Sequence, residues 1–237
     1  MDKADERILP NHLGFIVDGN RRWARERGLS TYDGHRRGFE VLKEMAYVAK
    51  DRGLKYVSAF IFSTENWGRS EDEVNYLMKI FLHAFKYDAK KMIKDGFRII
   101  FLGRRNRLSD EIIREMDEVE EWSRDNTATT LALCFNYGGH AEIVDAARHL
   151  AADVQAGKAS LADMTEEKFR QYIYHPELPD LDMLVRTSGE ERISGFMLWR
   201  MAYSELMFLD KKWPDMTEAD IDMILDEYTH RHRRFGK

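Results

Sequence analysis

The sequence contains little cysteine and proline, and it has no long apolar run. Cys134 is the only cysteine in 237 residues, which rules out a disulfide within the chain and disfavours a cysteine-ligated zinc site. The 4 prolines argue against long disordered linkers. No apolar stretch approaches the roughly 20 residues that a bilayer-spanning helix needs. A disulfide-stapled scaffold and a membrane-spanning protein are therefore excluded.

The charge is nearly balanced, with 37 Lys and Arg against 42 Asp and Glu and a net charge of −5. This balance does not favour bulk binding to nucleic acid or to an anionic membrane. We therefore expect no nucleic-acid partner, and any anion site must be a local cluster. Hydrophobic residues make up 43% of the chain, enough for one domain over 1–237 with 1–10 as an N-terminal extension. Residues 1–11 lack an apolar signal core, so we expect a cytoplasmic location.

Short apolar runs alternate with longer stretches of helical period. The runs predicted as strands are 13–17, 55–62, 97–102, 130–135, 183–185 and 206–209. The stretches predicted as helices are 37–51, 71–95, 109–124, 141–155 and 217–232. Continuous apolar strands are typical of parallel sheets that are buried on both faces. The pattern predicts a single α/β domain with a mainly parallel six-stranded sheet flanked by helices.

Polar residues follow four of the predicted strands. These strand exits are 18–23, 63–69, 136–139 and 186–192, and all are rich in Gly, Asn, Ser or Arg. Any one of them is also compatible with ordinary turn chemistry. Because ligands of open parallel sheets bind beyond the carboxyl ends of the strands, the four together predict an oxyanion site at that edge.

The first exit has the residues of a metal and phosphate site. Asp18 ends a strand and can hold Mg²⁺, and Gly19 lets backbone N–H groups approach a phosphate. Arg21 and Arg22 supply planar donors for phosphate oxygens. The alternative is a plain tight turn at Asp18-Gly19-Asn20.

A second diphosphate would fit the exit that Arg186 and Arg192 frame around Thr, Ser and Gly. It is neither a P-loop nor a dinucleotide fingerprint, because both glycine patterns are missing. His35 stands at a predicted helix start, where an imidazole either binds phosphate or is structural. Trp67 lies in a polar loop, where it either faces the ligand or packs.

Together these motifs resemble the cis-prenyltransferases. The segments that carry the resemblance are 10–24, 62–69, 136–139, 186–194, 199–206, 213–214 and 233–236. The resemblance implies a homodimeric fold with a hydrophobic tunnel. It also implies Mg²⁺-dependent condensation of isopentenyl diphosphate with an allylic diphosphate, such as farnesyl or geranyl diphosphate, to a cis-polyprenyl diphosphate. Peripheral membrane contact at the tunnel mouth is possible for product release.

The resemblance also implies roles for individual residues. Asp18 and Asn66 would be catalytic, and Asp18 and Glu205 would bind Mg²⁺. The implied substrate-binding residues are Gly19, Asn20, Arg21, Arg22, Trp23, His35, Ser63, Thr64, Glu65, Trp67, Arg69, Arg186, Arg192, Ile193 and Ser194.

Three positions near these motifs depart from the family pattern. Thr31 replaces an arginine that contacts diphosphate, a role that would then pass to Arg25 or Arg27. Gly195 replaces an asparagine. Glu191 stands where some members have a histidine near the metal, so it either ligates Mg²⁺ or points to solvent.

The implied tunnel also departs from the long-chain pattern. Phe39, Ile61 and Phe135 stand where long-chain members often have alanine, which predicts a product shorter than C55. Thr129, in place of a frequent leucine, argues weakly the other way. The ending 234–236 resembles an Arg-x-Gly motif that crosses the dimer in some relatives.

Two other functions remain as alternatives. One is a non-catalytic or partner-dependent subunit that acts as a binding protein, which the intact Asp18, Gly19 and Asn20 disfavour. The other is a generic phosphate- or RNA-binding protein that uses the arginine-rich stretch 104–107 or the basic tail.

Overall fold

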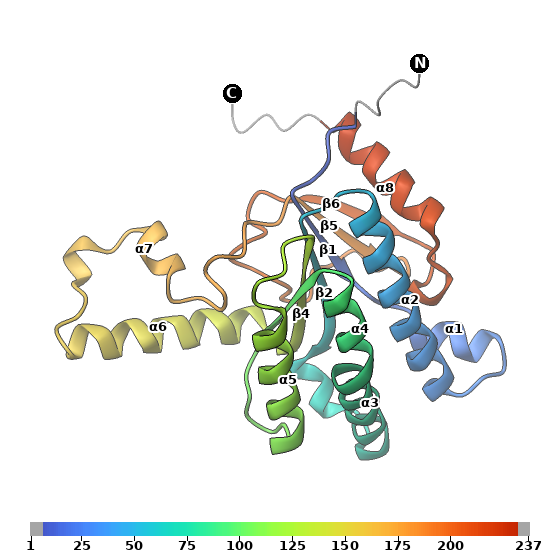
Figure 1. The fold of residues 1–237 in the computed structure, drawn as a ribbon, viewed down its shortest axis with the longest axis horizontal. Coiled ribbons are helices and arrows are strands. Elements are labelled where there is room, and N and C mark those ends of the chain that lie inside the picture. Colours follow the sequence, from blue (N-terminus) through green and yellow to red (C-terminus); the bar gives the residue numbers. More distant parts are fainter. Residues whose placement is uncertain (1–6, 232–237) are drawn as a thin grey trace.

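The computed structural model describes residues 7–231 and contains one six-stranded sheet (Figure 1). Its strands are β1 (His12–Ile16), β2 (Tyr56–Ser63), β3 (Phe97–Leu102), β4 (Thr129–Tyr137), β5 (Met183–Thr187) and β6 (Glu205–Leu209). The strand order is β3-β4-β2-β1-β5-β6, and every neighbouring pair is parallel. The predicted α/β fold with a parallel six-stranded sheet is confirmed.

Helices fill the connections between strands. They are α1 (Asn20–Glu26), α2 (Thr31–Asp51), α3 (Glu71–His83), α4 (Ala89–Lys94), α5 (Asp110–Ser123), α6 (Gly139–Gln155), α7 (Glu166–Arg170) and α8 (Glu218–His230). Short 3-10 turns are η1 (Thr64–Gly68), η3 (Leu161–Asp163) and η4 (Trp213–Asp215), and η2 (Ala84–Asp88) is a π-helical turn. In Figure 1, α6 projects from the body of the molecule and carries α7 beyond it.

Two helix predictions differ from the structure. Helix α2 begins at Thr31 rather than near residue 37, because Ser30 and Asp33 form a reciprocal capping box that starts it earlier. The predicted helix over 71–95 is interrupted by η2, where the chain adds one residue to a turn. The start of α2 lies beside the cleft described below, and η2 lies beside a separate small apolar cavity.

The sheet has a hydrophobic core on each face. One core packs strand residues against α2, α3, α5 and α8, and Trp213 of η4 is fully buried there. The other core is closed by two irregular segments, one before β5 that includes Leu178 and one after it that includes Phe196 and Met197. Because both faces are covered, the strands are mainly apolar and fix the positions of their polar carboxyl ends.

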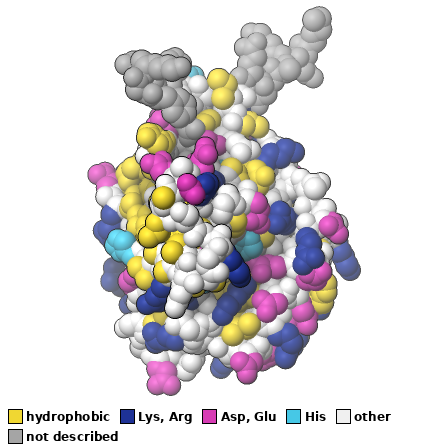
Figure 2. Space-filling model, turned by 90° about the vertical axis from the view of Figure 1, so that its left-hand side faces the viewer, with side chains coloured by type: hydrophobic (Ala, Val, Ile, Leu, Met, Phe, Trp, Pro, Cys, Tyr) yellow, Lys and Arg dark blue, Asp and Glu magenta, His cyan; other side chains and the backbone are white. Residues whose placement is uncertain are grey.

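The surface mixes both signs of charge. On the face of Figure 2, acidic and basic side chains are interspersed, and hydrophobic side chains gather toward one side. Among residues 7–231, no helix is both long enough and apolar enough to cross a bilayer.

Candidate active site

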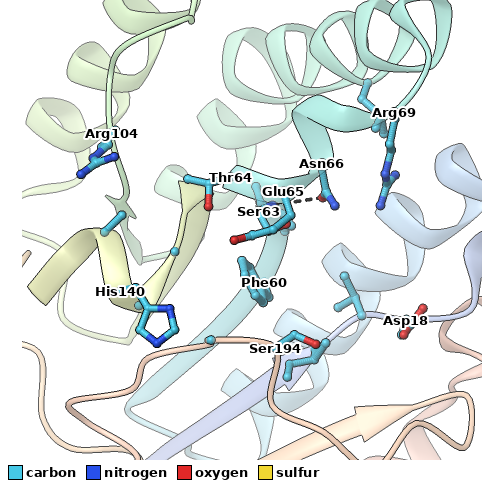
Figure 3. Close-up of a pocket in the computed structure, with 18 of the residues that line it drawn as sticks. Asp18, Phe60, Ser63, Thr64, Glu65, Asn66, Arg69, Arg104, His140 and Ser194 are labelled. Atoms are coloured by element: carbon cyan, nitrogen blue, oxygen red, sulfur yellow. Dashed lines mark hydrogen bonds between the residues drawn. The ribbon is translucent and has the colours of Figure 1, made fainter. Parts of the chain in front are cut away.

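A two-lobed cleft opens at the carboxyl ends of β1, β2 and β5. The inner lobe has a volume of about 820 Å³ and extends from Asp18 past Phe60 and Ser63 to the start of α6 (Figure 3). The adjoining lobe, of about 830 Å³, extends from Asp18 over α1, and we call it the arginine lobe. Asp18 lines both lobes, as the rule for ligands at parallel strand ends predicts.

Asp18 is held by β5 and by its own turn. Its backbone N–H donates to Thr187 Oγ1 (3.1 Å), and the Thr187 hydroxyl donates to the Asp18 carbonyl (2.7 Å). Gly19 donates its N–H to Asp18 Oδ1 (2.7 Å). Gly19 has a φ of 104°, and a Cβ there would lie 2.7 Å from Ser188 Oγ, so this turn requires glycine.

The charge of Asp18 is stabilised by arginines. Arg186 Nη2 donates to Asp18 Oδ2 (2.8 Å), and Arg22 Nη2 lies 3.4 Å from Oδ1. Burial alone would raise the pKa of the Asp18 carboxyl, but these hydrogen bonds and charges hold the pKa below its usual value. Asp18 is therefore an ionised, partly exposed carboxylate at neutral pH.

The arginine lobe carries an excess of positive charge. Its lining includes five arginines against two carboxylates, Asp18 and Glu190. The five arginines are Arg21, Arg22, Arg25, Arg69 and Arg192. Glu190 accepts from Arg22 (2.7 Å) and Arg192 (2.5 Å). The lobe therefore has three more cationic than anionic side chains, which favours a polyanion.

Arg186 faces the inner lobe from the end of β5. It is 4% exposed, and Nη1 donates to Ser194 Oγ (2.8 Å) and to the Arg192 carbonyl (2.5 Å). Its Nε is buried and has no hydrogen-bond partner in the described structure. A buried, unpaired guanidinium N–H is costly without an acceptor, so a ligand oxygen would stabilise it.

The exit of β2 forms the opposite wall of the inner lobe. Ser63, Thr64, Glu65 and Asn66 all line it, and Figure 3 shows them across the lobe from Asp18 and Ser194. Asn66 Oδ1 accepts the Ser63 N–H (3.0 Å) as part of a capping box at the start of η1. The predicted catalytic Asn66 and the predicted substrate-binding Ser63 are thus fixed on one turn.

Two predicted ligand-binding tryptophans do not line the cleft. The Trp67 indole donates to Asn136 Oδ1 (2.7 Å), packs edge-on against Phe62, and has the Arg107 guanidinium 4.4 Å from its ring. Trp23 donates to Asp215 Oδ1 (2.6 Å). An indole has only one N–H donor, and here it is used within the protein, so both rings act as packing groups.

Ile193 also lies outside both lobes, since it packs against the core on the far face of the sheet. The remaining predicted substrate residues do line the cleft. They are Gly19, Asn20, Arg21, Arg22, His35, Ser63, Thr64, Glu65, Arg69, Arg186, Arg192 and Ser194.

Glu205 lies at the opposite edge of the sheet from Asp18. It begins β6 and pairs in register with Met183 at the start of β5, whereas Asp18 contacts Thr187 at the end of β5. Four residues along a strand span about 13 Å. Within one chain, Asp18 and Glu205 are therefore too far apart to share a metal ion, and the role of the two residues in Mg²⁺ binding stays a prediction. No group of three metal-ligating side chains occurs within residues 7–231.

The structure locates the three residues that differ from the family pattern. Thr31 lines the arginine lobe, and so does Arg25, whereas Arg27 pairs with Asp215 (3.0 Å) and lies over Trp23. Of the two arginines suggested as substitutes at Thr31, only Arg25 therefore lines the arginine lobe. Glu191 is exposed and lines neither lobe.

Gly195 has a φ of 75° and lines the inner lobe. Its carbonyl accepts the Gly139 N–H (2.8 Å), which ties the loop after β5 to the start of α6.

The basic stretch 104–107 is neutralised within the protein. Arg104 forms a bidentate ion pair with Asp145 (2.7 and 2.8 Å), and Arg105 lies 3.3 Å from Glu120. Arg107 lies over Trp67. This stretch therefore does not form a row of unpaired cations, as a nucleic-acid surface would.

Sequence reasoning missed one residue beside the cleft, Glu73. It is 8% exposed and contacts His35, Arg69 and Arg21. Its contact with Arg69 joins the first turn of α3 to the residue that precedes the Ser70 N-cap, and the contact with His35 joins α3 to α2, so the sequence alone carried no clear signal for it.

Comparisons with known proteins agree with this site. A family model described as "Putative undecaprenyl diphosphate synthase" matches residues 16–236. The chain is 44% identical to an isoprenyl transferase of Thermotoga maritima over 96% of this chain and 97% of that protein. It is 42% identical to a trans,polycis-polyprenyl diphosphate synthase ((2Z,6E)-farnesyl diphosphate specific) of Thermobifida fusca, over 97% of this chain and 81% of that protein.

Solved structures are similar over nearly the whole chain. The crystal structure of lavandulyl diphosphate synthase from Lavandula x intermedia, in complex with dimethylallyl diphosphate, has a TM-score of 0.91 and 33% identity and covers 97% of this chain and 99% of that one. A probable undecaprenyl diphosphate synthase from Campylobacter jejuni has a TM-score of 0.79 and 26% identity, with the same coverage of both chains. The chain therefore belongs to the undecaprenyl diphosphate synthase family, the cis-prenyltransferases, and is a transferase that elongates prenyl chains.

Proposed function

We propose that the two-lobed cleft condenses isopentenyl diphosphate with an allylic diphosphate to give a cis-polyprenyl diphosphate. The observation that carries this proposal is the position of Asp18, which lies between Arg22 on the arginine lobe and Arg186 on the inner lobe. The allylic diphosphate would occupy the arginine lobe. Isopentenyl diphosphate would bind Arg186 and Ser194 in the inner lobe, where the unpaired Arg186 Nε offers a donor, and Arg192 would contact it from the arginine lobe.

The reaction needs stabilisation of a leaving group and removal of a proton. The allylic C–O bond breaks with its electron pair on the diphosphate, and arginine donors stabilise that charge. The double bond of isopentenyl diphosphate attacks the allylic carbon, and a proton then leaves the isopentenyl unit. Ser63 and Asn66 face Asp18 across the inner lobe, where a group that receives or relays this proton would lie. Holding both substrates in one cleft lowers the barrier by proximity.

The donor set at Asp18 fits Mg²⁺. Mg²⁺ is usually bound through one or two carboxylates together with substrate phosphate oxygens, and Asp18 is an ionised carboxylate beside the proposed diphosphate site. When bound, Mg²⁺ would neutralise charge on the departing diphosphate. A contribution from Glu205 would have to come from a second copy of the chain, as in the predicted homodimer.

The product would extend under α2 and η2. A small apolar cavity of about 30 Å³ lies there, and it is lined by Phe39, Phe85, Phe101, Leu131 and Leu133 among others. Ile61 lines the inner lobe, and Phe135 is fully buried against Phe81. These bulky walls support the proposal of a product shorter than C55.

Three further expectations stay predictions. They are the homodimer, the cytoplasmic location and the peripheral membrane contact during product release. The exposed apolar residues of the described chain include Val144 near the cleft. The proposed Arg-x-Gly ending at 234–236 lies outside the described residues.

Release of diphosphate tests the proposed function. We expect release only when isopentenyl diphosphate, an allylic diphosphate and Mg²⁺ are all present, and none after chelation by EDTA. A non-catalytic subunit would bind an allylic diphosphate without releasing diphosphate. Folded protein that shows this second behaviour with dimethylallyl, geranyl and farnesyl diphosphate would overturn the proposal.

A further inference from the structure

Glu73 is a buried carboxylate that lines neither lobe of the cleft. Its Oε1 accepts from Arg69 Nη1 (3.1 Å) and lies 3.0 Å from His35 Nε2. Its Oε2 lies 3.9 Å from Arg21 Nη1. These three partners come from three separate places, α2, the loop before α3, and α1, and all three line the arginine lobe, whereas His35 and Arg69 line the inner lobe as well. One carboxylate therefore connects the elements that build that lobe.

We propose that Glu73 is a positioning residue for the allylic diphosphate, and that it acts by holding Arg69 and His35 in place. This inference rests on the proposed function of the arginine lobe as the allylic diphosphate site. Glu73 itself would not touch the substrate, because it lines neither lobe and is connected to the arginine lobe through these partners.

The lobe needs such a residue because its cations repel each other. Arg69 is largely buried and lies near Arg21, and burial followed by the Arg21 charge lowers the pKa of Arg69, whereas Glu73 raises it. Without a central anion, the long arginine side chains would separate into several rotamers. Ordering them again when substrate binds costs conformational entropy.

Glu73 also fixes the His35 ring. Burial lowers the pKa of the His35 imidazole, so the ring is neutral at pH 7. The carboxyl of Glu73 would have a raised pKa from burial, but hydrogen bonding to His35 and the charges of Arg69 and Arg21 lower the pKa instead. An ionised carboxylate only accepts hydrogen bonds, so Nε2 must carry the imidazole proton. The contact therefore sets both the tautomer and the ring orientation.

Two effects of losing the Glu73 charge oppose each other. A less negative surrounding would attract the diphosphate more strongly, whereas the loss of the contacts would leave Arg69 and His35 disordered. The lobe opens to water and already has an excess of cations, so one more unit of positive charge is screened. The loss of ordering therefore dominates, and weaker binding is expected.

The test compares Glu73→Gln and Glu73→Asp with wild type and with Glu71→Gln in the full-length chain. Gln keeps the size of the side chain and removes its charge, and Asp keeps the charge but shortens the reach by one methylene. Glu71 is an exposed residue of the same first turn of α3, and it lines neither lobe. The measurements are KM for each substrate, the dissociation constant of farnesyl thiodiphosphate by calorimetry, and the melting temperature.

We expect Glu73→Gln to raise KM for the allylic diphosphate and the farnesyl thiodiphosphate dissociation constant by about tenfold, the effect of one charged hydrogen bond. KM for isopentenyl diphosphate should rise by less than the allylic KM, because Arg186 and Ser194 have no contact with Glu73, and only Arg69 and His35 carry the effect into the inner lobe. Glu73→Asp should raise allylic KM to a smaller extent, and Glu71→Gln should match wild type.

An active Glu73→Gln enzyme with unchanged allylic KM would overturn the inference, and so would an equal rise in both KM values. A lower melting temperature without a larger rise in the allylic KM than in the KM for isopentenyl diphosphate would assign Glu73 a purely structural role. That result would reject its role as a positioning residue. If Glu73→Gln fails to fold, Glu73→Asp decides by the same criteria. Wild-type protein that turns over neither substrate would instead reject the proposed function, and this inference with it.

Discussion

Arg186 joins Asp18, the proposed catalytic carboxylate, to the loop after β5. One guanidinium donates to Asp18, to Ser194 and to the Arg192 carbonyl, and this requires the planar fork of arginine. The same group leaves Nε for a ligand. A single side chain thus couples the orientation of Asp18 to the proposed site for isopentenyl diphosphate.

Arg186→Lys should raise KM for isopentenyl diphosphate by about tenfold or more, because an ammonium group cannot make these three contacts at once. Steady-state kinetics with the allylic diphosphate at saturation measure this. Arg148→Lys is the matched control, since Arg148 is exposed and pairs only with Asp145 at 3.4 Å. An unchanged KM for isopentenyl diphosphate in Arg186→Lys would remove Arg186 from the binding site.

His12 gives a prediction for stability at low pH. It is fully buried, with Nδ1 3.0 Å from the Pro179 carbonyl and Nε2 2.5 Å from Ser58 Oγ. Burial lowers the pKa of the imidazole from 6.5 to about 4. Above pH 6.5 the ring is neutral in both states and contributes nothing, but between pH 6.5 and about 4 the unfolded chain binds a proton that the folded chain does not.

The free energy of unfolding should therefore fall as the pH drops below 6.5, by about 1.4 kcal/mol from this group at pH 5.5. Urea unfolding at pH 7.5 and 5.5, at one protein concentration, measures the fall. We expect His12→Asn to be less stable than wild type at both pH values. Its free energy of unfolding should fall less between pH 7.5 and 5.5, by about 1.4 kcal/mol. An equal fall in the two proteins would show that His12 is not held neutral.

At the scale of elements, strands were predicted well because they are buried apolar runs. The strand over 97–102 matches β3, whereas the strand over 183–185 stops short of Arg186 and Thr187, which are buried but polar. Burial of polar residues at strand ends leaves no hydropathy signal. This burial arises from contacts between distant segments, such as the contact of Thr187 with Asp18.

The loops of the site were predicted correctly, and several side-chain directions were not. Trp23 and Trp67 lie within the polar segments 18–23 and 63–69, yet their indole N–H groups point to Asp215 and Asn136. Glu205 was separated from Asp18 by strand register, which residue types do not encode. The sequence motifs thus located the cleft, but they did not determine which side chains point into it.

The start of α6 is anchored by a buried ion pair. Glu142 and Arg200 are both fully buried, with Arg200 Nη1 donating to Glu142 Oε1 (3.0 Å) and Tyr137 donating to Oε2 (2.5 Å). This pair lies under the part of α6 that lines the inner lobe. Removing one partner would leave a buried charge without compensation.

Glu142→Gln should lower the free energy of unfolding by about 3 kcal/mol or more. Chemical denaturation measures it. Glu121→Gln is the control, because the Glu121–Arg124 pair is exposed and should change stability by less than about 0.5 kcal/mol. Equal effects of the two substitutions would show that burial does not set the strength of the α6 anchor.

At the scale of the whole molecule, we propose that the space between α2, η2 and the sheet limits the product length. Phe39 is half-buried and lines the small cavity there, beside the Lys43–Asp88 pair at 2.7 Å. Phe39→Ala would enlarge this space while leaving the fully buried Phe135 in the core. The substitution should therefore lengthen the product by at least one isoprene unit.

Chromatography of dephosphorylated products from farnesyl diphosphate would measure that change. Leu29→Ala is a suitable control, since Leu29 is exposed at 44% and lies in the arginine lobe, away from the cavity. A main product of C55 from the wild type would reject the short-product proposal, and an unchanged length in Phe39→Ala would exclude this cavity as the limit.

The most direct test of the account is incorporation of radiolabelled isopentenyl diphosphate by wild type and Asp18→Asn, with Mg²⁺ and each allylic primer. Asn keeps the size of the side chain but removes the charge that Arg186 and Arg22 stabilise. We predict elongation by the wild type and a fall in kcat of about a hundredfold or more in the variant. Folded Asp18→Asn protein that elongates at the wild-type rate would contradict a catalytic centre at Asp18.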